Sequence, residues 1–236
     1  MELLELFSGT KSVGKVAEQL GYEVISLDLK DADINCNILD WDYTTYPTNY
    51  FHVIWASPPC DTFSRMKFCQ IGRNGRTMES IQQDINDTGL PVLRKTEEII
   101  DYFKPKFYFI ENPQSGKMKD YIEDKPYHDV DYCKYADWGY QKRTRIWTNI
   151  QGFKPLVCKR DCNNLIGKRH KTRIGTIERI AYGGKIIDVN TKELRIKYKN
   201  VPRLSEFSTT TNLKDRHKIP PALIEDLFNC IDLDLR

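Results

Sequence analysis

The sequence has no long hydrophobic run. None of its 236 residues lies in a stretch that approaches the roughly 18 apolar residues of a membrane-spanning helix. Residues 1–7 contain no basic segment and no small-residue cleavage site, so they predict a first strand and not a signal peptide. Internal repeats and low-complexity tracts are also absent. The length then predicts one main α/β domain with a small appendage.

Cysteine is too sparse for a disulfide scaffold. The seven cysteines form an odd, scattered set, at positions 36, 60, 69, 133, 158, 162 and 230. Small secreted domains instead carry a dense and even set. The sequence therefore predicts a reducing, intracellular location, cytoplasmic or nuclear.

Acidic residues are nearly missing from one stretch, Lys142 to Arg173, which we call the basic segment. It has ten Lys or Arg against one acid, Asp161, a local balance of +9. The whole chain has 36 basic and 33 acidic side chains, so the remainder has 26 against 32, or −6. A basic segment on an acidic body predicts contact with nucleic-acid phosphates. A solvated charged loop is the alternative.

The first 28 residues have the pattern of a nucleotide-binding unit. A strand at 3–7 leads into the turn Ser8–Gly14, and a helix with a periodic apolar face follows and stops at Gly21. A second apolar run ends in Asp28, about twenty residues after the turn, where a carboxylate can accept the ribose hydroxyls of an adenosine cofactor.

The same turn matches most of a phosphate-binding P-loop through Gly9, Gly14 and Lys15. Val16, however, occupies the position where Ser or Thr must hold magnesium. The pattern therefore favours a cofactor whose adenosine lies across the sheet edge, such as S-adenosylmethionine, over a nucleoside triphosphate.

Two later strands are predicted to end in reactive side chains. Val53–Ala56 is a short apolar run that two prolines terminate, and Cys60 follows directly. Phe107–Ile110 is a second buried strand, with Glu111 after it. Because parallel strands present their carboxyl ends at one edge of a sheet, where ligands bind, we expect Cys60 and Glu111 at the same edge.

The remaining pattern is less regular. Residues 34–40 predict a short third strand and turn, and residues 70–89 a mobile loop that leads into a helix at 90–103. Two further strands are predicted at 132–135 and 145–148, and alternating stretches such as 194–198 suggest a small β-rich insert. A last helix opens at Pro220-Pro221.

Five motifs, taken in order, resemble those of the DNA (cytosine-5) methyltransferases: Phe7-Ser8-Gly9, Asp28, Pro58-Pro59-Cys60, Glu111-Asn112 and Gln141-x-Arg143-x-Arg145. The resemblance implies a Rossmann-like, S-adenosylmethionine-dependent methyltransferase sheet in residues 1–149. It further implies a small basic, β-rich target-recognition region at 150–216 and a C-terminal helix at 217–236 that packs back on the catalytic domain. The chain is similar to small members carried by phages and other viruses, which implies a host cell.

This resemblance implies methyl transfer from S-adenosylmethionine to C5 of cytosine in DNA. Cys60 is expected to add to C6 of a flipped base, which lets C5 attack the sulfonium methyl group. Glu111 is expected to bond the N3 edge of the base and Arg145 its carbonyl, with Arg143 structural or phosphate-facing. Both arginines are expected to favour the Cys60 thiolate.

The resemblance also implies cofactor contacts. The loop after the first strand is expected to hold the methionine end of S-adenosylmethionine. The end of the second strand is expected to hold its ribose, and the turn at 37–38 together with Pro58 its adenine. The residues are Phe7, Ser8, Gly9, Thr10, Asp28, Leu29, Asn37, Ile38 and Pro58. The chain departs from the family pattern at Lys11, where a glycine is usual, at Pro113, where valine is usual, and at 217–219.

Two other functions stay open: the same chemistry on RNA or a free pyrimidine nucleotide, and an inactive DNA-binding paralogue. The basic segment favours a polymer, and the joint presence of Cys60, Glu111 and Arg145 favours catalysis. We expect a monomer that binds double-stranded DNA with a flipped cytosine. The short region 150–216 predicts a short target sequence.

One pattern resembles part of a zinc motif. Cys158-x-x-x-Cys162 is followed by His170, but only these three ligands lie close in sequence. The nearest fourth is Cys133 or a carboxylate, so ordinary loop cysteines are favoured and no metal is expected.

Overall fold

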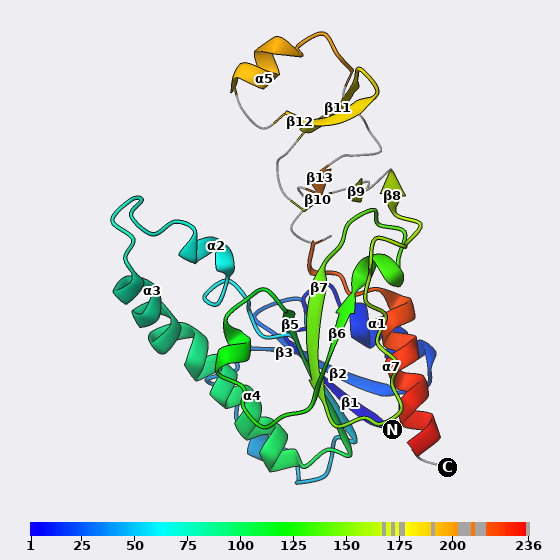
Figure 1. Cartoon of the computed structure of the whole chain (residues 1–236). Helices are drawn as coiled ribbons and strands as arrows, with labels where there is room; N and C mark the ends of the chain where they lie inside the picture. The colour runs from blue at the N-terminus through cyan, green and yellow to red at the C-terminus, as the bar shows by residue number, and fades with distance from the viewer. Residues whose placement is uncertain are drawn as a thin grey trace.

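The protein is built around a seven-stranded sheet with the order β3-β2-β1-β4-β5-β7-β6. The computed structural model describes residues 1–166, 169–170, 173–174, 178–189, 192–202, 209–210 and 216–234. The strands are β1 (Glu2–Leu6), β2 (Glu23–Asp28), β3 (Ile34–Asn35), β4 (Val53–Ala56), β5 (Phe107–Pro113), β6 (Tyr127–Asp131) and β7 (Arg143–Thr148). β1 to β5 pair in parallel, and β7 pairs antiparallel with β5 and β6. The expected Rossmann-like α/β sheet is confirmed (Figure 1).

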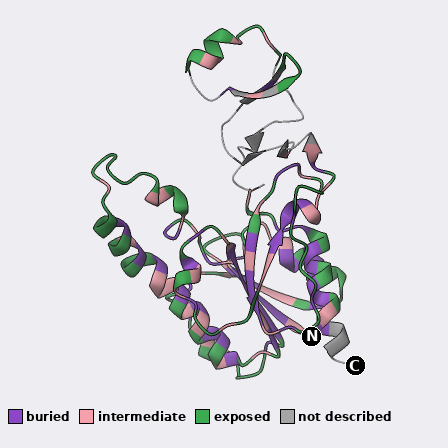
Figure 2. Cartoon of the chain, in the orientation of Figure 1, coloured by how far each residue is buried: buried purple, intermediate pink, exposed green. Residues whose placement is uncertain are grey.

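Helices cover both faces of this sheet. One face packs against α1 (Ser12–Gln19) and α7 (Pro221–Asp234), and the other against α3 (Met78–Asp84), the π-helix η2 (Ile85–Gly89) and α4 (Leu90–Phe103). Figure 2 shows the strands largely buried between these two layers. Successive strand residues alternate between the layers, as a pleated strand requires: Val53 and Trp55 join the α7 side, whereas Ile54 joins the α4 side.

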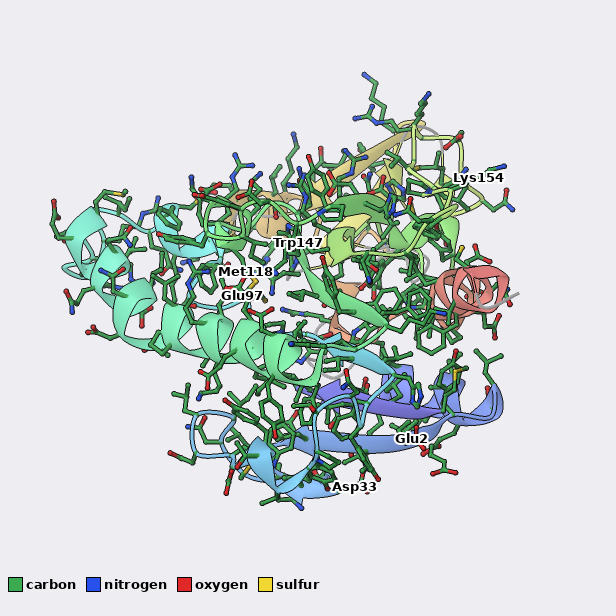
Figure 3. All side chains as sticks on the ribbon, turned by 90° about the horizontal axis from the view of Figure 1, so that it is seen from below. Glu2, Asp33, Glu97, Met118, Trp147 and Lys154 are labelled. Atoms are coloured by element: carbon green, nitrogen blue, oxygen red, sulfur yellow. The ribbon has the colours of Figure 1, made fainter. Side chains whose placement is uncertain are left out.

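Aromatic side chains fill much of each layer. On the α7 side Trp55 stacks on Phe109 with ring centroids 5.0 Å apart, and Phe228 of α7 lies 5.9 Å from Phe109. On the α4 side the buried residues include Trp147 and Met118, both labelled in Figure 3. Burying one such side chain contributes about 1.5–3 kcal/mol to folding, so these two clusters hold the helices on the sheet.

Small elements complete the chain. The short helices are η1 (Tyr43–Thr45), α2 (Arg65–Phe68), η3 (Met118–Asp120) and η4 (Tyr132–Lys134). After β7 the described elements are β8 (Leu165–Ile166), β9 (Arg169–His170), β10 (Arg173–Ile174), β11 (Glu178–Tyr182), β12 (Lys185–Val189), α5 (Lys192–Lys197) and β13 (Thr209–Thr210). These strands form three two-stranded sheets beyond the carboxyl edge of the main sheet (Figure 1). In the described part of the chain, no helix is both long and apolar enough to span a bilayer.

Two predicted strands are wrong. Residues 132–135 begin with the 3₁₀ turn η4, in which the Tyr132 carbonyl accepts the N–H groups of Tyr135 and Ala136, so the chain turns here instead of continuing as a strand. Residues 194–198 belong to α5 and its end, where the Tyr198 N–H donates to Leu194. An apolar pair four residues apart fits a helix face as well as a strand. The helices predicted at 90–103 and after Pro220 are confirmed.

Candidate active site

The candidate site lies at the carboxyl edge of the sheet. The strand order sets the ends of β2, β1, β4 and β5 next to one another, so Asp28, the loop after Leu6, Cys60 and Glu111 follow adjacent strands. Ala56 of β4 pairs with Ile110 of β5, which places Glu111 one residue beyond that pair. The structure therefore brings Cys60 and Glu111 to one edge.

The turn that carries Cys60 is held in position by a side chain of β5. The side-chain Nδ2 of Asn112, which is only 1% exposed, donates to the Pro58 carbonyl over 2.8 Å. Three residues after Cys60, the side chain of Phe63 is buried against Gly89 of η2, where an added Cβ would lie 2.8 Å from the Phe63 ring. The absence of a side chain at Gly89 thus lets the Cys60 loop pack closely on η2.

Glu111 has two partners that the sequence motifs did not identify. Its carboxylate is buried, and its Oε1 accepts the Tyr132 hydroxyl over 3.1 Å. The Lys142 Nζ lies 3.8 Å from the same oxygen and 4.7 Å from the centre of the Tyr132 ring. The sequence could have indicated Lys142, because this residue occupies the variable position of the motif Gln141-x-Arg143. It gave no indication of Tyr132, which belongs to no motif and lies in a segment predicted to be an ordinary strand.

The thiol of Cys60 is held neutral. Burial raises its pKa, the negative charge of Glu111 raises it further, and the positive charge of Lys142 opposes both effects. The prediction that Arg143 and Arg145 favour the thiolate is therefore wrong for this structure. The cation that acts on Cys60 is Lys142.

Arg143 and Arg145 lie on the other face of the sheet from Glu111. Asn112 pairs with Arg145, and Glu111 pairs with Ile146. Paired residues share a face and neighbours alternate, so the two arginines emerge with Asn112.

Each arginine is already bonded to an aspartate of β6. Arg145 donates through Nε and Nη2 to Asp129 over 2.7 and 2.9 Å, and its guanidinium lies 3.6 Å from the Tyr127 ring centre. Arg143 donates in the same way to Asp131 over 3.1 and 2.7 Å. Asp129 takes two of the five N–H donors of Arg145, which leaves donors for a second ligand.

The loop after β1 has the features of a cofactor cradle. Phe7, Gly9 and Lys11 all have left-handed φ angles, of 61°, 50° and 53°. Asp28 accepts the Gly9 N–H over 2.8 Å and the Leu29 N–H over 2.7 Å. Each carboxylate oxygen keeps a second lone pair, which fits the paired hydroxyls of a ribose.

The other predicted cofactor residues surround this loop. Ser8 is buried, and its Oγ has no hydrogen-bond partner within the described ranges, whereas Thr10 bonds Ser12 over 2.6 Å. Leu29 is 71% exposed beside Asp28, and apolar surface there suits a purine ring. In the next turn Ile38 is buried, Asn37 accepts the Leu39 N–H over 3.1 Å, and Pro58 is buried at the β4 end. This set fits S-adenosylmethionine.

A triphosphate does not fit the start of α1. Glu5 of β1 is buried there, and its carboxylate accepts the Val13 N–H over 3.3 Å and the Gly14 N–H over 3.1 Å. Burial raises the pKa of Glu5 to about 7. Because these N–H groups at the helix start already have an acceptor, the structure gives no support to the P-loop alternative.

The structure also brings four potential metal ligands together, contrary to the sequence interpretation of ordinary loop cysteines. Cys133 joins Cys158, Cys162 and His170, and their ligand atoms all lie within 4.8 Å of one another. Of the two possible fourth ligands, Cys133 or a carboxylate, the structure brings in Cys133, which lies 25 residues before Cys158.

Comparison with known proteins gives one strong similarity. No protein-family model matches the sequence. The chain is 40% identical over 233 residues to the probable DNA (cytosine-5)-methyltransferase of Frog virus 3 (isolate Goorha), across 97% of this chain and 99% of the viral one.

Solved structures are more distant. A methyltransferase of Entamoeba histolytica is 18% identical with a TM-score of 0.47 over 67% of this chain, and the S. pombe Dnmt2 methyltransferase is 12% identical with a TM-score of 0.39 over 66%. The chain spans about half the length of these two proteins, 55% and 52%.

Proposed function

Because the chain belongs to the DNA (cytosine-5)-methyltransferase family, we propose that it methylates C5 of cytosine in DNA through a covalent bond from Cys60 to C6 of the base. One observation carries the proposal: the strand order places the half-buried thiol of Cys60 and the buried carboxylate of Glu111 at the same carboxyl edge of the sheet. A nucleophile beside a carboxylate is the pair that addition to a cytosine ring needs.

The first step is a proton transfer that substrate binding enables. The Cys60 thiol loses its proton to Glu111, and the resulting carboxylic acid donates to N3 of the flipped cytosine. This removes the negative charge that raises the Cys60 pKa and makes C6 electrophilic. The sulfur then forms a bond to C6 with its electron pair. The π electrons of the C5–C6 bond shift toward C5, which becomes nucleophilic.

Lys142 and Tyr132 hold Glu111 for this exchange. The Tyr132 hydroxyl fixes one carboxylate oxygen, and the Lys142 ammonium compensates the charge on the same oxygen. Arg145, anchored on Asp129, is proposed to reach the base carbonyl with a donor that Asp129 does not use. Arg143 has a structural role through Asp131.

S-adenosylmethionine, when bound, supplies the sulfonium methyl group that C5 attacks. The chain's own residues would hold it: Asp28 the ribose, Leu29 and Ile38 the purine, and Ser8 in the loop after β1 the methionine end. After methylation, solvent takes the C5 proton, the bond between sulfur and C6 breaks with its electron pair returning to the Cys60 thiolate, and N3 gives its proton back to Glu111.

The division of the chain follows the same proposal. Residues 1–149 carry the chemistry, residues 150–216 read the DNA target, and residues 217–236 return to the sheet. The basic segment supports DNA as the substrate because its Lys154, Lys159 and Arg160 are exposed and available to phosphates. The virus relative supports action inside a host cell, and we propose a monomer.

The test is methyl transfer from labelled S-adenosylmethionine. Purified protein is offered duplex DNA of mixed sequence, RNA and free dCMP in separate reactions, with Cys60→Ala as the control. Label recovered as 5-methylcytosine in DNA, and lost in Cys60→Ala while DNA binding persists, supports the proposal. If label is recovered only in RNA or only in dCMP, that molecule is the substrate and the proposal for DNA is wrong. Absence of transfer by protein that binds both DNA and cofactor identifies a binding module instead.

A further inference from the structure

We propose that Cys133, Cys158, Cys162 and His170 bind one structural zinc ion that joins the part of the basic segment after β7 to the main sheet. The ligand atoms of the four residues all lie within 4.8 Å of one another. The His170 Nε2 is 3.7 Å from the Cys158 sulfur and 3.4 Å from the Cys162 sulfur. Tetrahedral zinc, with bonds of about 2.3 Å to sulfur and about 2.0 Å to nitrogen, requires ligand separations of about 3.5–3.8 Å.

The chemistry of the ligands favours zinc in a closed site. Three thiols and one imidazole match the Cys₃His sets of structural zinc sites, and all three cysteines are free of disulfides. Soft thiolate ligands disfavour magnesium and calcium, which take oxygen. Four protein ligands leave no position for water, so the ion has no catalytic role.

The loop between the two nearby cysteines is shaped to support a bound thiolate. The Arg160 N–H donates to the Cys158 sulfur over 3.3 Å, and Arg160 adopts a left-handed φ of 65° to direct it there. Such N–H donors lower the charge on a metal-bound sulfur and orient it. A non-glycine residue in this conformation costs free energy, which a metal-fixed turn offsets.

The surrounding polar contacts also converge on this cluster. Asn164 is buried and donates to the Cys133 and Ala136 carbonyls over 2.8 and 2.7 Å, and it accepts the Gly139 N–H over 2.9 Å. Asp131 accepts the Cys158 N–H over 2.7 Å as well as the two N–H groups of Arg143. The cluster is thus tied to the ends of β6 and β7.

The position of the ligands gives the ion its role. Cys133 belongs to η4, next to the Tyr132 that donates to Glu111, whereas the other three ligands belong to the basic segment. One ion therefore cross-links the edge of the candidate active site to the segment proposed to meet DNA. Metal binding of this kind contributes directly to the free energy of folding.

The experiment is a measurement of zinc in the purified full chain by plasma mass spectrometry after dialysis. We expect one zinc per chain in the wild type, a loss of more than half in Cys133→Ser and His170→Ala, and one zinc in the matched control Cys69→Ser. Cys69 is an exposed cysteine outside the cluster. This readout does not depend on methyl transfer, so it stands or fails separately from the proposed function.

A second measurement covers variants that do not fold. Wild-type protein stripped by a chelator at mild pH and reloaded with cobalt(II) should absorb one equivalent and show the strong visible bands of tetrahedral thiolate coordination. It should also melt at a higher temperature with zinc than without. A wild-type chain that holds no zinc, takes up no cobalt and melts at one temperature in both states overturns the proposal.

Discussion

The Lys142 ammonium lies 3.8 Å from the Glu111 carboxylate, on the face of the sheet opposite to the two arginines of the same motif. Lys142 precedes β7 by one residue and stands two residues before Thr144, so it shares a face with Thr144 and Ile146. Ile146 pairs directly with Glu111. The residue between Gln141 and Arg143 thus contacts Glu111 directly, whereas Arg143 and Arg145 are anchored on aspartates of β6.

The first prediction concerns Lys142→Met. Removing the ammonium takes away a positive charge that lowers the pKa of Cys60, so this pKa rises further above its ordinary value. At any pH below that pKa the thiolate fraction falls, and each increase of one in the pKa slows alkylation of Cys60 by iodoacetamide by about tenfold. The measurement is the rate of Cys60 alkylation against pH, read by peptide mass spectrometry.

Lys154→Met is the matched control for this variant. Lys154 is an exposed lysine of the basic segment, labelled in Figure 3. Its loss should therefore leave the pH dependence of Cys60 alkylation unchanged. An unchanged profile in Lys142→Met, or an equal change in both variants, would contradict a specific effect of Lys142 on the thiol.

The second prediction separates ionisation from catalysis. Glu111→Gln removes the negative charge that raises the pKa of Cys60 most, so this pKa falls and alkylation becomes faster at neutral pH. Methyl transfer should nevertheless drop by about 10² to 10⁴, because an amide cannot pass a proton to N3. The two assays move in opposite directions. A variant that is slower in both assays indicates that Glu111 only supports the loop.

Much of this site could be predicted from local sequence because parallel strands place their ends at one edge. Cys60 and Glu111 each follow a short apolar run, and the order of the runs set them side by side. The face on which a side chain emerges was not predictable in the same way. It depends on the register of β7 against β5, which pairs Arg145 with Asn112 and is set by contacts far apart in sequence.

Tyr132 and Cys133 show the same limit in local structure. Both fit the pattern of strand residues, but the chain turns at η4, where the Tyr132 carbonyl accepts the N–H groups of Tyr135 and Ala136. That turn points Tyr132 at Glu111 and Cys133 at Cys158 and Cys162. The contact of Tyr132 has no signal in the sequence, and Cys133 could be named only as one of two possible fourth ligands.

The third prediction tests the support beneath Cys60. Asn112→Ala removes the hydrogen bond to the Pro58 carbonyl and should cost about 1–3 kcal/mol of unfolding free energy. It should also lower the turnover number of the folded enzyme, since the thiol no longer has a fixed position. Asn149→Ala is the control, because Asn149 makes similar bonds to Lys106 and Tyr108 at the opposite end of β5. Equal turnover in the two variants would show that Asn112 only stabilises the fold.

The fourth prediction concerns the buried Glu5. Its pKa in the folded chain is about 7, against an ordinary value of 4.5, with burial as the main cause. Below pH 4.5 the carboxyl is protonated in both states and makes no difference. Between about pH 4.5 and 7 the unfolded chain releases this proton while the folded chain keeps it, so the free energy of unfolding falls as the pH rises.

Glu5→Gln removes this dependence, because an amide does not titrate in this range. The stability of the variant relative to the wild type should therefore rise by about 2–3 kcal/mol between pH 5 and pH 8, at 1.36 kcal/mol for each pKa unit. Urea unfolding at the two pH values measures it, with the exposed Glu225→Gln as a control that should show no such change. A relative stability independent of pH would mean that Glu5 is ionised throughout, held by the Val13 and Gly14 N–H groups strongly enough to offset its burial.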